Sequence, residues 1–362
     1  MNNRVFNFYA GPATLPLPVL EEAQRDLLNF NSTGMSVLEI SHRAKAYDEI
    51  HHEAEARLKK LLKLGDDFRV LFLQGGASTQ FAMAPMNFLT PEKKADYIIT
   101  GSWAKKAMKE AVRYGQVNVA ASTEEENFKR IPNPEELKLS ADAAYVHLTS
   151  NNTIFGTQWQ SFPDFGNTPI VADMSSDIIS RPFDARKFGL IYAGAQKNLA
   201  PAGLTVVIIR QDFAETATAD LPTILKYETH LKSDSLYNTP PSFNIYLLNL
   251  VLKWLENTGG LEVMAKKNQE KAGIIYEEID DSAGYYRGHA EAGSRSLMNI
   301  TFRLPNEELE KKFVAESTEK GLIGLKGHRS VGGLRASVYN AMPLEGAKAL
   351  AAFMREFRKN NR

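Results

Sequence analysis

The segment IYAGAQKNLAPAGLTVVIIR, residues 191–210, holds one lysine between two apolar runs. Each run is typical of a buried strand, and Pro201 and Gly203 turn the chain back between them. A lysine at the end of a buried strand loses solvent, which lowers its proton affinity and makes its amine a nucleophile. We therefore interpret Lys197 as a functional lysine. The alternative at this stage is a solvated lysine on a hairpin loop.

Further apolar runs on both sides of this segment predict strands that alternate with amphipathic helices. The strands are expected at residues 69–73, 96–100, 116–120, 144–148, 169–172, 190–193 and 204–209, and the helices at 18–30, 44–64, 81–88, 104–114 and 242–256. Such alternation predicts an α/β fold with a mostly parallel central sheet. In sheets of this kind, ligands bind at the carboxyl ends of the strands.

Chemically informative side chains follow several of these strands. The turn after residue 73 is glycine-rich and leads into a helix through Ser78, an arrangement that binds phosphate. It lacks the P-loop lysine and the third glycine of the dinucleotide fingerprint, which favours a single small phosphate over a nucleotide. An ordinary strand-to-helix turn is the alternative.

Trp103, Thr153, Asp173 and Lys197 follow other strands of the predicted sheet. Their convergence predicts a planar ligand whose ring stacks on an aromatic side chain, whose ring atom faces a carboxylate and whose carbonyl meets an amine. Pyridoxal 5′-phosphate satisfies each of these demands.

Two His-Arg pairs and one further arginine predict an anionic substrate. His42 and Arg43 precede the helix at 44–64, His328 and Arg329 lie in a glycine-rich loop, and Arg335 lies on the next strand. Arginine binds carboxylate or phosphate in a bidentate manner. Exposed pairs that make only local ion pairs are the alternative.

Residues 211–237 form a long stretch with weak periodicity, after which Asn238 and Thr239 precede two prolines and the helix at 242–256. Thr239 suits a helix cap. A second helix N-terminus offered to the ligand phosphate is the functional alternative.

The glycines at 259 and 260 suggest the boundary of a large cofactor-binding domain, residues 16–260. We predict a smaller α/β domain from residues 1–15 and 261–362. It contains helices at 261–279, 307–320 and 344–358 and strands at 296–302 and 334–338.

Composition narrows the function classes. The 362 residues carry 43 basic and 43 acidic side chains and no cysteine. Nucleic acid and anionic membranes are therefore poor partners, and disulfides, thiolate metal sites and a cysteine nucleophile are excluded; no metal site is predicted. No run reaches transmembrane length, and no apolar segment follows Arg4, so we expect a cytoplasmic protein.

Five motifs in this order resemble the phosphoserine aminotransferase family, which belongs to the class-V aminotransferases: NFYAGP at 7–12, EISHR at 39–43, YAGAQKN at 192–198, PAGLT at 201–205 and GHRSVGG at 327–333. The resemblance extends over essentially the whole chain. It implies a fold-type I pyridoxal-phosphate transferase and a homodimer with shared active sites. It also implies amino transfer between L-glutamate and 3-phosphohydroxypyruvate, giving O-phospho-L-serine and 2-oxoglutarate in serine biosynthesis. A second role on a phosphorylated threonine intermediate of pyridoxine biosynthesis stays open.

The resemblance also implies individual roles. Lys197 would be the Schiff-base lysine, Asp173 would face the ring nitrogen, Trp103 would stack on the ring and Thr153 would lie near the ring hydroxyl. The phosphate group would be held by Ala77, Ser78 and Gln196, with Asn238 and Thr239 from the other subunit. Substrate would be bound by Arg43 with His42 at its distal acidic group, by His328 and Arg329 from the partner chain, and by Arg335 at its α-carboxylate.

This chain departs from the family at two positions. Some members have an arginine where Ser78 stands, which leaves the division of substrate-phosphate contacts among the other cationic residues open. Tyr9 stands where some members have a small polar residue.

The same residues can be weighed against three other functions. A cysteine desulfurase needs a cysteine, which this chain lacks. A serine–glyoxylate or alanine–glyoxylate aminotransferase needs fewer cationic contacts, and a catalytically silent cofactor carrier or scaffold does not need the lysine, aspartate and arginines together.

Overall fold

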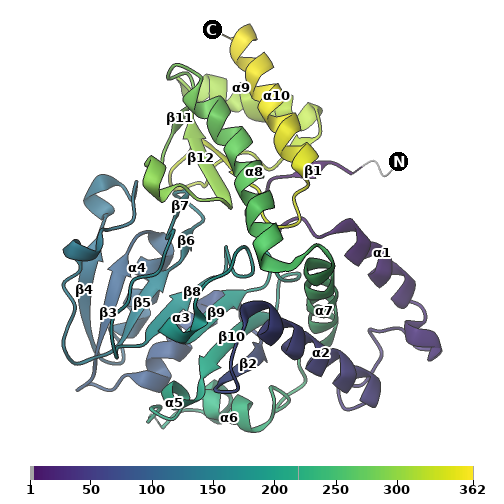
Figure 1. Cartoon of the computed structure of the whole chain (residues 1–362), viewed down its shortest axis with the longest axis vertical. Helices are drawn as coiled ribbons and strands as arrows, with labels where there is room; N and C mark the ends of the chain where they lie inside the picture. Colours follow the sequence, from purple (N-terminus) through teal and green to yellow (C-terminus); the bar gives the residue numbers. More distant parts are fainter. Residues whose placement is uncertain (1–3, 219, 362) are drawn as a thin grey trace.

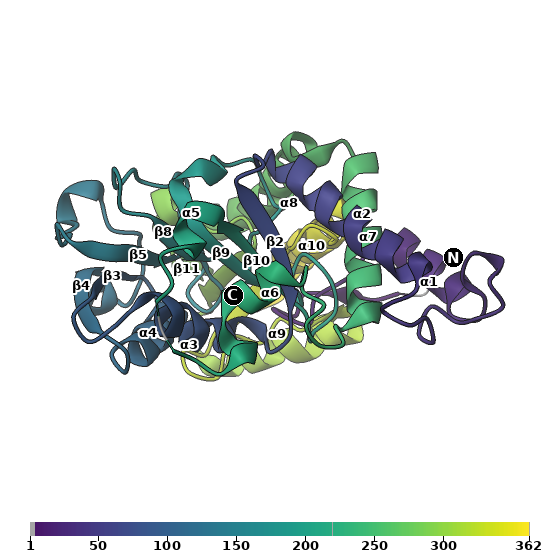
Figure 2. The ribbon, with the colours of Figure 1, turned by 90° about the horizontal axis from the view of Figure 1, so that it is seen from below.

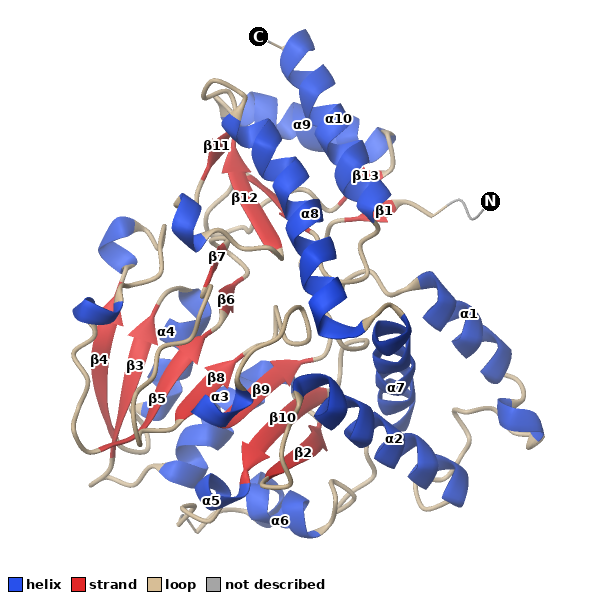
Figure 3. Ribbon diagram, in the orientation of Figure 1, coloured by secondary structure: helices blue, strands red, loops and turns tan. Residues whose placement is uncertain are grey.

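The structure is a computed structural model that describes residues 4–218 and 220–361. Residues 1–3 and 362 of the predicted small domain, and residue 219 of the 211–237 stretch, lie outside the described residues. The largest element is a seven-stranded sheet with the order β2-β10-β9-β8-β5-β3-β4, seen side by side in Figure 3. Its strands are β2 (Phe68–Leu73), β3 (Lys94–Ile99), β4 (Gln116–Ser122), β5 (Ala143–Thr149), β8 (Ile170–Asp173), β9 (Phe188–Gly194) and β10 (Thr205–Arg210).

Strand direction confirms the predicted mostly parallel sheet. β10 is antiparallel to both of its neighbours, and the pairings from β9 across to β4 are parallel. β8 and β9 are buried along their whole length. Strands covered on both faces have continuous apolar sequences, which is why the predicted strands agree with those observed.

Helices cover both faces of the sheet. The layer that contains α2 and the layer that contains α3 and α4 lie on opposite sides of the strands (Figure 2). Alternate residues of β2 enter different cores: Phe72 packs with α2 and α7, whereas Leu73 packs with α3 and α4. The helices of this part are α1 (Leu17–Asp26), α2 (Lys45–Leu62), α3 (Gly76–Phe88), α4 (Ser102–Ala111), α5 (Gln211–Ala214), α6 (Tyr227–Lys232) and α7 (Ser242–Asn257).

The long helix α8 (Gly260–Asp280) runs from this layered part to a second group of elements, at the top of Figure 1. Its first turns pack in the core with α2 and α7, and its last turns pack in a third core. The group contains α9 (Glu307–Glu319), α10 (Leu344–Asn360), β11 (Arg287–Gly288), β12 (Asn299–Arg303), β13 (Leu322–Ile323) and β14 (Leu334–Ser337). The short strands β6 (Asn151–Asn152) and β7 (Thr157–Gln158) form a separate hairpin.

The N-terminal arm joins the second group. β1 (Phe6–Asn7) pairs in parallel with β13, and Phe8 lies in the third core. We therefore keep the division into residues 16–260 and residues 1–15 with 261–362 as a proposal, which this pairing and the separate core support.

Several local expectations differ from the structure. The helix expected at 81–88 begins at Gly76, as α3. Trp103 was expected in the loop before a helix at 104, but α4 begins at Ser102 and includes it. The expected cap at Thr239 is wrong: the residue before α7 is Pro241, and no side chain caps the helix. Two prolines separate Thr239 from Ser242, so its hydroxyl is too far along the chain to reach the first turn. The 211–237 stretch contains the short helices α5 and α6.

Candidate active site

The expected site residues gather at one edge of the large sheet. In the register, Leu73 of β2 is opposite Thr205, and Thr205 is opposite Gly194 of β9. On β8, the next strand after β9, Asp173 is opposite Tyr192 of β9 and Thr149 of β5. Lys197, Asp173 and Thr153 therefore follow the carboxyl ends of adjacent strands, where α/β sheets bind ligands.

Lys197 is half-buried, and two hydroxyl groups hold its amine. Nζ donates to Thr153 Oγ1 at 2.7 Å and to Ser176 Oγ at 2.8 Å, and these two oxygens lie 2.7 Å apart. Burial lowers the pKa of Lys197 to about 8; the charge of Asp173 opposes this shift and that of Arg335 adds to it. At pH 7 about a tenth of this amine is therefore unprotonated, far more than for an ordinary lysine, which suits a nucleophile.

Asp173 is a buried carboxylate at the end of β8. Its Oδ1 accepts hydrogen bonds from the backbone N–H of Ser175 at 2.9 Å and from its hydroxyl at 2.6 Å. Burial raises the pKa of Asp173, while Lys197 and the Ser175 donors act in the opposite direction. A cation placed beside this carboxyl would stabilise its ionised form.

Ser175 and Ser176 are functional candidates that sequence analysis missed. Ser175 holds Asp173 and also accepts from the backbone N–H of Gly194 at 3.0 Å, whereas Ser176 holds Lys197. Asp177, in the same loop, accepts from Gln158 Nε2 at 2.9 Å and from the Ser150 hydroxyl. The only sequence signal was the position of this loop directly after the strand that ends at Asp173.

The predicted phosphate site lies at the start of α3. Gly75 and Gly76 have φ angles of 97° and 71°, a region that favours glycine, and they turn β2 into the helix that carries Ala77 and Ser78. Ala77 is half-buried and Ser78 is exposed. Backbone N–H groups at such an N-terminus bind anions.

Three other expected phosphate contacts lie near this edge of the sheet. Asn238 Nδ2 donates to Gln74 Oε1 at 3.0 Å, and Gln74 Nε2 donates to the carbonyl oxygen of Thr239 at 3.0 Å, so both residues lie beside the turn before α3 of their own chain. Gln196 precedes Lys197, and its carbonyl oxygen accepts from the backbone N–H of Ala13 at 2.9 Å. The N-terminal arm therefore contacts the lysine loop.

Trp103 lies in the first turn of α4, after β3. Asn152 Nδ2 donates to Thr100 Oγ1 at 3.1 Å, which ties the end of β3 to the segment that carries Thr153. The ammonium of Lys106 lies 4.3 Å from the centroid of the Trp103 ring. Trp103 is thus held next to the Thr153 segment, where a planar ligand could stack on it.

Arg335 brings the second group of elements to the site. It lies on β14, and its Nη1 donates to the carbonyl oxygen of Thr153 at 3.2 Å. Arg335 and His328 both line a cavity of about 210 Å³. Burial, followed by the charges of Arg335, Arg329 and Lys106, lowers the pKa of His328.

The remaining cationic residues lie at the surface. Arg43 and Arg329 are exposed, and His42 is half-buried in the turn before α2. Within residues 4–218 and 220–361, no ion pair or hydrogen bond links the side chains of His42 or Arg43 to Lys197. Their expected roles, and the expected contributions from a partner chain, stay predictions because the structure contains one chain.

These residues fit the predicted cofactor. The indole Nε1 of Trp103 and Nε of Arg335 are buried and have no hydrogen-bond partner in the described part of the chain. A buried donor without a partner costs free energy, so polar atoms of a ligand would be accommodated here. A reactive amine, a buried carboxylate, an aromatic ring and a helix N-terminus are the set that a pyridine aldehyde phosphate requires.

Comparison with known proteins gives one consistent family. The family model Aminotransferase class-V matches residues 5–350. The phosphoserine aminotransferase of Geobacillus kaustophilus is 60% identical over 358 residues, covering 98% of this chain and 99% of that protein. Among solved structures, phosphoserine aminotransferase from Bacillus circulans subsp. alkalophilus is 56% identical with a TM-score of 0.98, covering 100% of both chains. The PLP-bound phosphoserine aminotransferase from Trichomonas vaginalis is 42% identical with a TM-score of 0.92, covering 97% of this chain and 100% of that one.

Proposed function

The chain belongs to the class-V aminotransferase family, and from this premise we propose that it transfers an amino group between L-glutamate and 3-phosphohydroxypyruvate. The products are 2-oxoglutarate and O-phospho-L-serine, as in serine biosynthesis. The observation that carries the chemistry is the amine of Lys197, whose pKa is lowered to about 8, one strand away from the buried carboxylate of Asp173.

We propose pyridoxal 5′-phosphate as the cofactor, because the family and the site residues both suit it. When bound, this cofactor supplies an aldehyde that links covalently to amines and a ring that withdraws electrons from the substrate α-carbon. Lys197 would hold the aldehyde, and Trp103 and Thr153 would contact the ring. The phosphate group would be bound by Ala77, Ser78 and Gln196 and by the partner's Asn238 and Thr239.

Lys197 also acts as the general acid and base in this proposal. Its amine accepts a proton from the substrate α-carbon and returns one during the reaction, and a pKa near the working pH favours both steps. The hydroxyls of Thr153 and Ser176 orient Nζ. Free rotation of the lysine side chain is thereby restricted, which lowers the entropic cost of reaching the reactive geometry.

Asp173 stabilises positive charge on the ring nitrogen. The two Ser175 donors hold the carboxylate in place and favour its ionised form. Its burial makes the interaction with a cation stronger than it would be in water.

Cationic side chains select the substrate. Arg335 would bind the α-carboxylate, and His42, Arg43, His328 and Arg329 would share the distal carboxylate or phosphate. Ser78 offers a hydroxyl and no charge at α3, so these four residues must supply the charge that binds the phosphate of the substrate.

We further propose that the enzyme is a homodimer with active sites built from both subunits. The support is that Arg43, Arg329 and Thr239, all expected at the site, are exposed on the single chain. No helix in the described part of the chain could span a membrane. Cytoplasmic location and the activity in pyridoxine biosynthesis stay predictions.

The visible absorbance spectrum of the purified, cofactor-loaded protein tests this proposal. We expect a band from lysine-bound cofactor that is lost on addition of O-phospho-L-serine alone, as the amino group moves to the cofactor. L-serine, which lacks the phosphate, is the matched control and should leave the band largely unchanged at the same concentration. A band that responds equally to serine or alanine would reject the phosphorylated substrate, and the absence of a band after adding the cofactor would reject the cofactor itself.

A further inference from the structure

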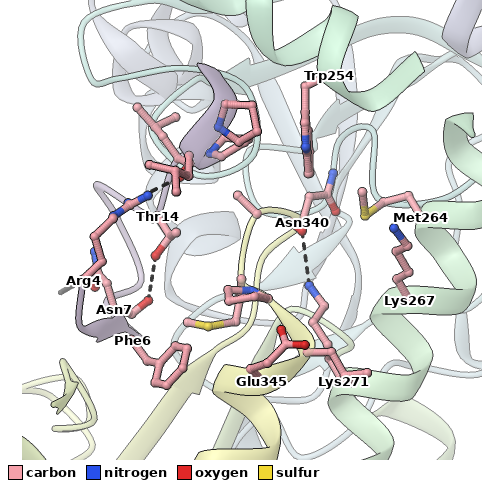
Figure 4. Close-up of a pocket in the computed structure, with 18 of the residues that line it drawn as sticks. Arg4, Phe6, Asn7, Thr14, Trp254, Met264, Lys267, Lys271, Asn340 and Glu345 are labelled. Atoms are coloured by element: carbon pink, nitrogen blue, oxygen red, sulfur yellow. Dashed lines mark hydrogen bonds between the residues drawn. The ribbon is translucent and has the colours of Figure 1, made fainter. Parts of the chain in front are cut away.

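A buried lysine on α8 holds a segment of backbone that leads to the active site. Lys271 is 2% exposed. Its Nζ donates to the carbonyl oxygens of Tyr339 at 2.6 Å, Val338 at 3.0 Å and Asn340 at 3.4 Å. Figure 4 shows Lys271 extending from its helix toward Asn340. An ammonium group has three N–H donors, so these carbonyls use all of them.

Within the described residues, the three carbonyl oxygens are the hydrogen-bond partners of Lys271 Nζ, and no carboxylate forms an ion pair with it. Burial, followed by the charge of Lys267, lowers the pKa of Lys271 to about 7. Near neutral pH both protonation forms of this amine are therefore populated, and both have N–H donors for the carbonyl oxygens. A polar group buried at this cost, with only carbonyl partners, is suited to fixing the backbone that carries those carbonyls.

Core packing holds the start of this backbone segment, where Val338 lies in the third core, but its end borders a cavity. A cavity of about 590 Å³ borders Asn340 and the residues that follow it, and Lys271 lines the same cavity (Figure 4). On this side the segment lacks the close side-chain contacts of a packed core. Its hydrogen bonds therefore have a larger share in fixing its position.

Asn340 connects the backbone held by Lys271 to the loop that carries Lys197. Its backbone N–H donates to Asn198 Oδ1 at 3.0 Å, and its Nδ2 donates to the carbonyl oxygen of Ile179 at 2.9 Å. Its own Oδ1 accepts from Asn268 Nδ2 at 2.9 Å. Asn340 is thus hydrogen-bonded both to α8 and to the loop after Asp173.

Asn198 joins the two loops that hold the reactive amine. Its Nδ2 donates to the carbonyl oxygens of Ser176 at 3.2 Å and Ile178 at 3.1 Å, while its backbone follows directly on Lys197. The Lys197 amine in turn donates to Ser176 Oγ at 2.8 Å. Asn198 therefore fixes the two backbones between which this hydrogen bond forms.

We propose that Lys271 is a positioning residue for Lys197, acting through Asn340 and Asn198. By holding the 338–340 backbone, it keeps the Asn198 amide in place and so maintains the desolvated, hydroxyl-bound position of the Lys197 amine. This inference rests on the proposed function, in which Lys197 is the reactive amine. Without Lys271, the loops separate enough to admit water, and the proton affinity of Lys197 rises toward that of an ordinary lysine.

The test measures the proton affinity of Lys197 in cofactor-free protein. The rate at which added pyridoxal 5′-phosphate forms the lysine-bound band is recorded from pH 6 to pH 10, because only the unprotonated amine reacts. For the wild type we expect a midpoint near the pKa of about 8. For Lys271→Met we expect the midpoint to move up by about one unit, which lowers the rate below the midpoint about tenfold.

Two control variants separate positioning from general destabilisation. Lys267→Met, one turn earlier on α8 and lining the same cavity, should keep the wild-type midpoint. Leu350→Ala removes a fully buried side chain of the third core and should lower thermal stability without moving the midpoint. Should Lys271→Met not fold, Lys271→Gln, which retains two N–H donors, should give a smaller shift in the same direction.

A double-mutant cycle tests whether Lys271 acts on Lys197 through Asn198. Asn198→Ala should raise the midpoint alone, and adding Lys271→Met should shift it little further, because both act on one chain of contacts. Fully additive shifts, or a Lys271→Met midpoint equal to that of the wild type, would overturn the inference. If the wild type itself forms no band, the proposed function fails, and the inference with it.

Discussion

Arg335 Nη1 donates a hydrogen bond of 3.2 Å to the carbonyl oxygen of Thr153, whose hydroxyl in turn accepts from the Lys197 amine. Thr153 therefore links the Arg335 guanidinium to the Lys197 amine, although Arg335 lies on β14, in the other group of elements. Its buried Nε has no partner in residues 4–218 and 220–361.

This geometry predicts that Arg335→Lys weakens substrate binding more than turnover. Lysine keeps the charge and loses the planar pair of donors that binds a carboxylate, so we expect KM for both amino-acid substrates to rise about 10- to 100-fold, with kcat reduced less. Steady-state kinetics measure both constants. Arg210→Lys, at the opposite end of the sheet and paired with Asp212, is the matched control. A variant with an unchanged KM would place the α-carboxylate elsewhere.

Lys197→Ala should remove amino transfer while the protein remains folded. In the proposed function, the change deletes the amine that would hold the cofactor and move the proton, and general acid–base catalysis alone contributes about 10²- to 10⁴-fold. Circular dichroism and gel filtration report folding, and a coupled assay of 2-oxoglutarate formation reports activity. Near-normal turnover in this variant would reject the assigned role.

Asp173→Asn should keep the cofactor bound but lower turnover by about 10²- to 10⁴-fold. Asparagine preserves the shape and removes the charge that, in the proposed function, would stabilise a protonated ring nitrogen. The amide oxygen can still accept from both Ser175 donors. Cofactor content, measured after release in alkali, should match the wild type. Equal turnover in the two proteins would show that the ring is stabilised by another group.

His328 lines a cavity with Arg335 of its own chain. The family resemblance instead implies that His328 and Arg329 act on the site of the partner chain. Subunit complementation tests whether its neighbour Arg329 acts on the partner's site. If it does, mixing inactive Lys197→Ala and Arg329→Ala subunits should restore about a quarter of the wild-type activity, since half of the dimers then contain one complete site. Each variant mixed with itself is the control. No recovery after confirmed subunit exchange would assign Arg329 to the site of its own chain.

Sequence was sufficient to predict the sheet and the positions of Asp173 and Lys197, because strands buried on both faces give continuous apolar runs that end where polar residues begin. The same local patterns placed Trp103 in a loop, because the expected helix began at residue 104 and α4 begins two residues earlier, at Ser102. Helix starts depend on backbone hydrogen bonds that a periodic pattern does not specify.

The contacts that hold Lys197 were beyond prediction for a different reason. Ser176 looked like any loop serine, and its role depends on a partner 21 residues away. Asn198 and Asn340 are 142 residues apart, and the bond between them exists only after both groups of elements have folded. Periodicity reports which face of an element is buried and carries no information about such pairs.

The lowered pKa of Lys197 makes a final prediction about the stability of the cofactor-free protein. Its pKa is about 8 in the folded chain and 10.5 for an unperturbed lysine. Between these two pKa values the unfolded chain binds more protons than the folded chain, so the contribution of Lys197 to stability rises with pH. Below pH 8 the full free-energy cost of burying the charge remains. This cost is roughly 3 kcal/mol, at about 1.4 kcal/mol per pKa unit. Lys197→Met removes this cost, and the hydroxyls of Thr153 and Ser176 can still bond to each other. Urea denaturation should therefore show Lys197→Met to be more stable than the wild type at pH 7, with the difference shrinking toward pH 10. Leu350→Ala, which removes no ionisable group, should give a loss that does not vary with pH, and a Lys197→Met advantage that grew with pH would contradict the assignment.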